Sequence, residues 1–529
     1  MKNEIAWFSH PRIAETLSVR FTECGTGSHS SQFMKATTLI ALLSAYLLGS
    51  SPAAEVDTYG GFTDIKGEKT GFFHVEKING RWWLVTPEGN AFWGIGIAHP
   101  ITDFTESAVT FVYDGDQEAW LNGSIQKMRD LGYNCVWTGP YCPERLSTGY
   151  VDRELAERVF SEAKIPYAFP LPILKHRVEM APGEKRPDVF DDSYTTFVEE
   201  LVSKYVPKLK DDPWIMGYYY GFAPWMDDVV WPNDLIERKG SPGRERLIGV
   251  LEDRYEGDIE RFNQVYQTSF ESFEQLKATG SIVYPEWIKR HKMGFVPMPE
   301  NPGSQELFDD AQALLGEIVE HTYRLAHGAI RKHDKNHLIL GCYIKEASLT
   351  VDHWKRIGPY IDVLTPQHVS RVFPIDPVVE ALDKPVLISD QPFGNVYPVP
   401  LITAKNAPGA VPDHVDRLVL YDLLANRISR DPNYIGVDFC AVLYDQSHED
   451  KAYEIGQPGF YTKYGEPKDQ LCRTVIHFNE EMIDNLAKPL DLEEVAALDE
   501  KFHETLARYR AVMRDRKDFL LRRPAVSRP

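Results

Sequence analysis

Residues 71–98 read GFFHVEKINGRWWLVTPEGNAFWGIGIA and contain the change of pattern that decides the fold. Up to Gly94 the stretch is divided by Asn79-Gly80 and by Pro87-Glu88-Gly89-Asn90, which are turn sequences. It therefore predicts an antiparallel β-meander over residues 71–94. From Phe92 to Ala98 the chain is apolar without a polar interruption, which is typical of a strand buried on both faces of a parallel sheet.

Seven more short apolar runs follow this first one, and stretches with helical periodicity separate them. They are 134–138 (NCVWT), 168–174 (AFPLPIL), 215–220 (IMGYYY), 337–344 (HLILGCYI), 363–366 (VLTP), 386–389 (VLIS) and 435–442 (IGVDFCAV). Eight buried strands that alternate with helices predict an α/β protein, specifically a (β/α)8 TIM barrel. A doubly wound sheet is the alternative, but no GxGxxG follows any early strand.

The spacing of the runs predicts the domain organisation. We expect an N-terminal β-meander over 55–91, a barrel over 92–485 with a long insertion after strand four at 222–336, and a C-terminal helix and basic tail over 486–529. Within the insertion, 244–255, 257–266 and 306–333 have helical patterns. A loop of this size on the C-terminal side of a barrel strand usually shapes the substrate cleft.

The N-terminus contains a segment that we exclude from the fold. Residues 34–54 read MKATTLIALLSAYLLGSSPAA, with a charged start, a short apolar run and small residues before a cleavage point after Ala53. This is the layout of a secretory signal peptide, too short to span a bilayer stably. We therefore expect Met34 to be the true start, residues 1–33 to be a mis-assigned leader, and the mature protein to be periplasmic or extracellular, without a membrane segment.

Composition excludes several classes of function. Lys and Arg number 58 against 78 Asp and Glu, and this net charge of −20 argues against nucleic-acid binding. Cys135, Cys342 and Cys440 lie in apolar runs and are expected to be core thiols. The cysteine and histidine spacings contain no CxxC, HxH or HExxH pattern, so we expect neither a metal nor a cofactor. Composition does not predict the oligomeric state.

Several segments together resemble clan A glycoside hydrolases of the agarase and β-galactosidase-like branch. They are NGRWWLVTPEGNAFWGIGI (79–97), DDPWIMGYYYGFAPW (211–225), RYEGDIERFNQVYQTSFESFEQL (254–276), AIRKHDKNHLILGCY (329–343), KPVLISDQPFG (384–394) and GFYTKYGEPKDQL (459–471). The resemblance implies a TIM barrel, hydrolysis by two carboxyl groups, and an oligo- or polysaccharide substrate that contains galactose, with or without sulfate.

The positions that carry the catalytic glutamates in these relatives are different here. At the end of strand four, where relatives have Asn-Glu, this chain has Gly221-Phe222, and a Phe cannot transfer a proton. At the end of strand seven, where relatives have a nucleophilic Glu, it has Asp390. Asp is shorter than Glu by about 1.5 Å, so Asp390 is expected to act as an inverting base, a hydroxyl acceptor or a rim residue unless the cleft compensates.

The missing acid has four candidates near strand ends. Asp227 and Asp228 follow strand four, Glu346 follows strand five, and Asp438 lies within the apolar run of strand eight. A carboxylate inside such a run must face the barrel mouth or find a partner, because burying it unpaired is costly. For the others, solvated loop charges are the alternative.

Further polar and aromatic residues near strand ends are expected to bind the substrate. They are His99, His176 and His368, Arg177 and Arg371 for an anionic substituent, and Trp137, Tyr141, Trp225 and Tyr397 as stacking platforms. A metal site formed by these histidines with Asp390 and Asp438 is the less favoured interpretation. Two hypotheses follow: a secreted hydrolase with a rearranged acid/base pair, or a catalytically inactive relative that binds glycans in the same cleft.

Overall fold

The computed structural model divides into two units, Met1–Glu55 and Val56–Pro529. It describes residues 55–101, 106–137, 152–174, 186–222, 228–292, 296–344, 349–367, 375–392, 395–396, 410–411, 414–445, 459–491, 493–502, 504–505, 507–508 and 511. The predicted leader and signal peptide therefore lie outside the described residues, and every element below belongs to the second unit. Among the described helices, none combines the length and apolar character that a membrane span needs.

The second unit begins with an antiparallel sheet in the region of the predicted meander. It contains β1 (Phe62–Lys66), β2 (His74–Ile78), β3 (Arg81–Val85) and β4 (Asn90–Phe92), in the order β1-β4-β3-β2. The turn between β2 and β3 places Asn79 and Gly80 at φ 52° and 83°, the left-handed conformation that Asn-Gly adopts readily. Two details correct the prediction: β1 was not expected, and Phe92 ends the antiparallel sheet and does not begin the parallel strand.

The parallel strands form two hydrogen-bonded sets. One has the order β5-β12-β9, from β5 (Gly94–His99), β12 (Tyr434–Val442) and β9 (Val386–Pro392). The other has the order β6-β7-β8, from β6 (Tyr167–Pro170), β7 (Ile215–Phe222) and β8 (Leu338–Tyr343). A separate parallel pair joins β10 (Asn395–Val396) to β11 (Ala410–Val411).

Isolated parallel bridges connect the two sets on both sides. On one side the bridges are Gly96↔Cys135 and Val136↔Tyr167, and on the other Ile344↔Pro366 and Leu364↔Val386. The predicted strands 134–138 and 363–366 are therefore reduced to bridge residues. When these bridges are included, each of the eight predicted strand positions pairs in parallel with the next one along the chain. The last, β12, pairs with the first, β5.

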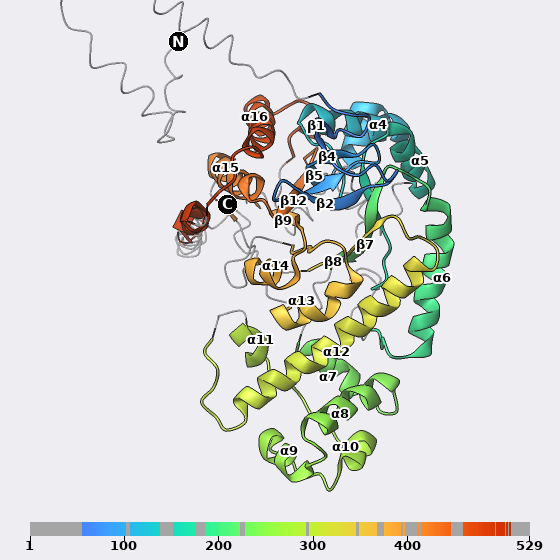
Figure 1. The fold of residues 1–529 in the computed structure, drawn as a ribbon, viewed down its shortest axis with the longest axis vertical. Coiled ribbons are helices and arrows are strands. Elements are labelled where there is room, and N and C mark those ends of the chain that lie inside the picture. Colours follow the sequence, from blue (N-terminus) through green and yellow to red (C-terminus); the bar gives the residue numbers. More distant parts are fainter. Residues whose placement is uncertain are drawn as a thin grey trace, which may run out of the picture. The chain divides into compact units, whose positions relative to one another are not determined.

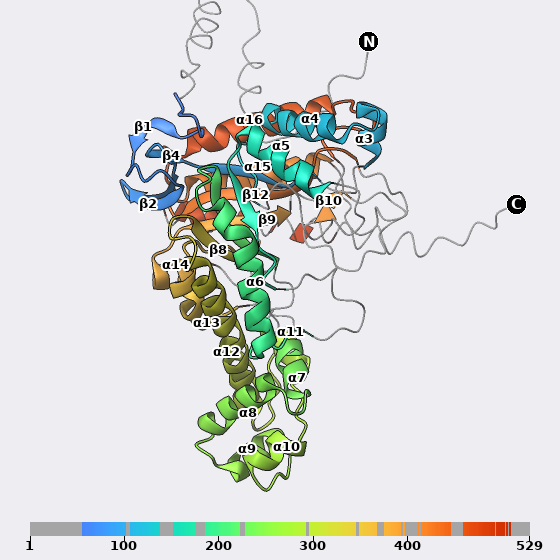
Figure 2. The ribbon, with the colours of Figure 1, turned by 90° about the vertical axis from the view of Figure 1, so that its right-hand side faces the viewer.

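Helices separate the parallel strands, as Figures 1 and 2 show. They are α3 (Glu106–Tyr113), α4 (Gln117–Asp130), α5 (Arg153–Ala163), α6 (Asp192–Leu209), α13 (Val351–Ile357), the 3-10 turn η2 (Gly358–Tyr360), α14 (Asp376–Leu382), α15 (His414–Arg430) and α16 (Asp469–Asn485). Aspartate side chains cap the starts of α4, α5 and α6 by accepting a backbone N–H of the first turn.

The described residues between β7 and β8, where the insertion was predicted, contain six helices. They are α7 (Val230–Ile236), α8 (Pro242–Arg254), α9 (Ile259–Tyr266), α10 (Phe273–Thr279), α11 (Trp287–Lys292) and α12 (Ser304–Arg331). The predicted helices at 244–255, 257–266 and 306–333 correspond to α8, α9 and α12. In Figure 2, α7 to α10 gather around one end of the long α12, whose other end leads back toward β8.

The core is divided by the parallel strands into two clusters. Neighbouring residues of one strand alternate between them: Tyr219 belongs to the smaller cluster, whereas Tyr218 and Tyr220 belong to the larger one beneath the helices. The smaller cluster also includes Phe73, Leu84 and Phe92 of the antiparallel sheet region, packed with residues near the strand starts. Both faces of the parallel strands are thus buried, and the antiparallel sheet covers the amino-terminal end of the smaller cluster.

Candidate functional site

Asp390 lies in a β-bulge near the carboxyl end of β9. Val437 of β12 pairs with Ile388 and Phe439 pairs with Gln391, so Ser389 and Asp390 together oppose the single residue Asp438. Asp390 has φ 47°, a left-handed conformation that Asp tolerates better than most residues. Bulges of this kind redirect a side chain next to functional sites.

Gln367 holds the Asp390 side chain in place. Its side-chain amide donates a hydrogen bond to Oδ2 of Asp390 over 2.6 Å. The Gln367 backbone N–H donates to the Ile344 carbonyl oxygen at 2.8 Å, which ties this residue to the end of β8. Sequence reasoning missed Gln367, although its place directly after the apolar run 363–366 was a signal that could have found it.

Asp438 is fully buried in β12, with 0% of its surface exposed. Neither of its carboxyl oxygens has a hydrogen-bond partner of ordinary geometry among the described residues. Burial, followed by the negative charge of Asp390, raises the pKa of Asp438 well above its usual value, and the Asp390 backbone N–H opposes this only in part. The negative charge of Asp390 therefore reaches Asp438 and favours its protonated form.

Gly96 of β5 leaves the space that the Asp438 carboxyl group occupies. Gly96 pairs with Asp438, and a Cβ at Gly96 would lie 3.1 Å from Oδ1 of Asp438. The same Cβ would lie only 2.5 Å from the Trp137 indole, and one at Gly94 only 2.6 Å from it. Glycine is therefore required at both positions, because the buried carboxyl and the indole fill this side of β5.

Aromatic and thiol groups surround the carboxyl pair. Tyr343 donates its hydroxyl to the backbone carbonyl of Trp137 and stacks on Tyr219, with centroids 4.8 Å apart. Burial raises the pKa of the Tyr343 hydroxyl and of the Cys135 thiol well above their usual values, and the charge of Asp438 adds to both shifts. Both groups are consequently neutral and add no negative charge beside Asp438.

Trp137 is not a stacking platform in this structure, which corrects the prediction. Its side chain is fully buried against Gly94 and Gly96, because the short strand position 135–136 directs it under β5. Cys135 and Cys342 are buried free thiols as expected, whereas Cys440 is only partly buried.

The prediction that Asp228 is a candidate acid is also corrected, because Lys292 already neutralises its charge. It is 1% exposed and forms an ion pair with Lys292 at 2.8 Å, while Gln312 donates to its Oδ2 at 2.6 Å. These partners come from α11 and α12, so Asp228 ties the insertion to the strand-four loop.

The remaining predicted site residues cannot be placed. Outside the described residues lie Asp227, Glu346, Tyr141, His176, Arg177, Trp225, His368, Arg371 and Tyr397. His99 and Phe222 lie in β5 and β7, but their side chains are not described. Within the described part of the chain, no three His, Cys, Asp or Glu side chains are arranged to hold a metal ion.

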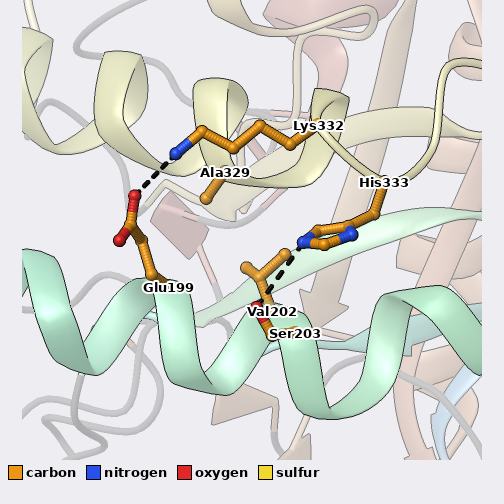
Figure 3. Close-up of a pocket in the computed structure, with 6 residues that line it drawn as sticks. All are labelled: Glu199, Val202, Ser203, Ala329, Lys332 and His333. Carbon is orange, nitrogen blue, oxygen red and sulfur yellow. Dashed lines mark hydrogen bonds and ion pairs between the residues drawn. The ribbon is translucent and has the colours of Figure 1, made fainter.

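A hollow of about 140 Å³ lies between α6 and the end of α12 (Figure 3). It is lined by Glu199, Val202, Ser203, Ala329, Lys332 and His333. Lys332 pairs with Glu199 at 2.6 Å, and both side chains are exposed. Its residues come from α6, from α12 and from the turn after α12, whereas Asp390 and Asp438 lie on strands, so it is separate from the carboxyl pair.

Comparison with known proteins adds to this geometry. The chain is 20% identical over 451 residues to β-agarase B of Vibrio sp. (strain JT0107), a match of 72% of this chain and 45% of that protein. It thus spans less than half the length of this relative. No protein-family model matches the chain.

Solved structures give a broader match. An agarase, AgWH50C, aligns with a TM-score of 0.59 and 17% identity over 88% of this chain and 72% of its own. An exo-β-agarase aligns with a TM-score of 0.60 and 15% identity over 87% and 71%. The chain has the fold of these agarases. The predicted α/β class and the predicted resemblance to the agarase branch are confirmed.

Proposed function

We propose that this protein is a glycoside hydrolase that acts on a galactose-containing polysaccharide, with Asp390 and Asp438 as its carboxyl pair. The observation that carries the proposal is the bulge between β9 and β12, which sets Asp390 and Asp438 opposite each other. The bulge lies toward the carboxyl ends of the parallel strands, where active sites of α/β folds collect. The agarase resemblance supports the substrate class.

The proposal includes a closed (β/α)8 TIM barrel over residues 92–485, with the insertion 222–336, the meander 55–91 and the C-terminal helix and tail 486–529. The cyclic order of the parallel pairings supports it, as does the division of the buried residues into two clusters on the two faces of the strands. Export through the segment 34–54 belongs to the same proposal, because a polysaccharide cannot enter a cell intact.

The two carboxyl groups have different roles in this mechanism. Asp438, whose pKa is raised by burial and by Asp390, retains its proton near neutral pH and donates it to the glycosidic oxygen as that C–O bond breaks. Asp390, oriented by Gln367, accepts a proton from the water that adds to the anomeric carbon. The shorter Asp side chain leaves room for this water, so we propose the inverting course, which requires carboxyl groups about 6.5–9.5 Å apart.

A second candidate function is glycan binding without hydrolysis. It is favoured by the complete burial of Asp438, since an acid must reach the substrate oxygen directly or through one water. The cleft of a former hydrolase can retain its sugar contacts when proton transfer is lost.

The experiment that separates these functions begins with the purified protein and agar, carrageenan, porphyran and galactan fragments. New reducing ends identify a hydrolase, whereas calorimetric binding without new ends identifies a glycan-binding protein. For a hydrolase, we expect Asp390→Asn and Asp438→Asn each to lower the rate by roughly 10²–10⁴-fold.

Asp383→Asn is a matched control for the Asp390 variant. Asp383 also has a left-handed backbone, at φ 44°, but is exposed and paired with Lys77. We expect it to retain full activity. Asp390→Asn should change the free energy of unfolding by less than about 1 kcal/mol, because Asn also tolerates left-handed φ. Full activity of Asp390→Asn would refute the role of the carboxyl pair.

A further inference from the structure

Two exposed aromatic rings, Phe111 and Tyr464, lie in contact on the surface. Phe111 is 56% exposed and Tyr464 57% exposed, and their ring centroids are 5.2 Å apart with the planes inclined by 53°. The other large apolar side chains exposed in the described residues, Val56 and Val283, are aliphatic. Exposed rings in contact are unusual on a surface that also carries many charges, since burial of each ring would stabilise the fold.

The Tyr464 side of the pair is built on a rigid turn. The Thr462 backbone N–H donates to the Glu466 carbonyl, and the Gly465 N–H donates back to the Thr462 carbonyl. Gly465, at φ 84°, packs against Val112, where a Cβ would approach to 3.1 Å. The turn is therefore pressed against the helix that carries Phe111.

The Phe111 side is anchored by its neighbour Tyr113 at the end of α3. The Tyr113 hydroxyl is hydrogen-bonded to the Tyr444 hydroxyl at 2.8 Å. Tyr444 in turn forms a bridge with Tyr461, directly before the turn. Because both supports are fixed, the two exposed rings have little freedom to lose when they bind a ligand.

Phe111 and Tyr464 lie on the same side of the strands as Asp390 and Asp438. β5 ends at His99, and α3, which carries Phe111, begins soon after it at Glu106. β12 ends at Val442, and Tyr444 lies two residues later. β5 and β12 are the strands that carry Gly96 and Asp438. The rings therefore stand beside the carboxyl ends of β12, which carries Asp438, and of the neighbouring strand β5.

We propose that Phe111 and Tyr464 form a second binding site for the polysaccharide chain, at a distance from the bond that is cleaved. This inference rests on the proposed function and extends it from a sugar unit in the cleft to a long polymer. Each ring offers a flat apolar face to a pyranose unit, and two inclined rings suit a chain that twists between successive sugars. Lys463, whose Nζ lies 5.4 Å from the Tyr464 ring centroid, supplies a donor for a hydroxyl or sulfate oxygen.

The test is affinity electrophoresis of the full chain in gels containing dissolved agarose or porphyran. The Asp390→Asn variant serves as the background, so that the polymer is not degraded during the run. In this background we expect Phe111→Leu and Tyr464→Leu, which keep an apolar side chain but lose the flat face, to bind the retarding polymer roughly tenfold more weakly. Phe111→Tyr and Val283→Ala, the control at an exposed aliphatic residue, should be retarded as the background variant is.

Hydrolysis of a short oligosaccharide separates this proposal from the proposed function. With Asp390 intact, Phe111→Leu and Tyr464→Leu should cleave a tetrasaccharide at the wild-type rate and polymer more slowly. Unchanged retardation of both Leu variants in both gels would overturn the second site even if hydrolysis is established. Equal loss on tetrasaccharide and polymer would also overturn it, because the rings would then act through the cleft or the fold. If no substrate is cleaved, retardation of the variants in the two gels is the test of the second binding site. If Lys463→Gln loses retardation in the porphyran gel and keeps it in the agarose gel, Lys463 donates to a sulfate oxygen.

Discussion

Gln367 donates its side-chain amide to Oδ2 of Asp390 at 2.6 Å, and its own backbone is tied to Ile344. This contact makes Gln367 a positioning residue for the proposed base. In Gln367→Leu we expect kcat to fall at least tenfold with little change in KM, because a misplaced base weakens the transition state more than the substrate complex. Steady-state kinetics on the identified glycan measure this split.

Gln367→Glu is the variant that distinguishes positioning from packing. An ionised Glu would repel Asp390, whereas a protonated Glu can donate the same hydrogen bond. We expect this variant to approach wild-type activity only at acidic pH. A pH–rate profile parallel to that of the wild type would contradict the positioning role.

The pH dependence of stability reports on Asp438. Because burial and Asp390 raise its folded-state pKa, its stabilising contribution is complete below its ordinary value of 3.8 and is lost as pH rises toward the folded pKa. Asp438→Asn cannot ionise. Its melting temperature relative to wild type should therefore increase as the pH rises above 4, and a difference that does not change with pH would show that Asp438 ionises normally in the fold.

His353 has the opposite effect on the pH dependence of the free energy of unfolding. Burial, with its N–H···O contact to Gln312 only partly compensating, lowers the pKa of His353 from 6.5 to about 4. The unfolded chain then binds a proton that the folded one does not, so stability is complete above pH 6.5 and is lost as pH falls toward 4. The loss should be about 3 kcal/mol. Urea unfolding at several pH values should show it in the wild type, and a His353→Gln variant should lack it.

The ion pair between Asp228 and Lys292 should be costly to break from one side. Lys292 is 8% exposed and Asp228 1%, so Lys292→Met leaves a buried carboxylate uncompensated. We expect a loss of about 3 kcal/mol in the free energy of unfolding, partly recovered when Asp228→Asn is added. Lys332→Met breaks the exposed pair with Glu199 and should cost less than about 1 kcal/mol. Equal losses in the two Lys variants would contradict the buried pair.

The positions of the long parallel strands could be predicted from the sequence because strands buried on both faces are apolar at almost every position. The run 435–442 coincides with β12 to within one residue, and 337–344 coincides with β8 to within one residue at each end. β1 was missed because FTDIK has two apolar residues, Phe62 and Ile65, that lie three positions apart and so lack the alternation that indicates a strand. The runs 134–138 and 363–366 lacked the length to form more than single bridges.

The candidate site was only partly predictable. Asp390 was identified from the resemblance, which places a glutamate at the end of strand seven, and Asp438 because it interrupts an apolar run. Their coupling depends on a bulge that places two residues opposite one, and such an irregularity leaves no periodic trace in the sequence. Likewise, the neutralisation of Asp228 comes from Lys292 on another helix, and no local pattern specifies which distant cation a carboxylate meets.

The pairing of β5 with β12 has a consequence for synthesis of the chain. The indole N–H of Trp93, just before β5, donates to Tyr434 at the start of β12, and 341 positions separate them. At about 5–20 residues per second, the ribosome takes on the order of 20–70 s to supply this partner. For that time β5 has an apolar edge with no strand to pair with on that side. A holding chaperone, or delivery to an export channel before β12 is made, would protect this edge from pairing with other nascent chains.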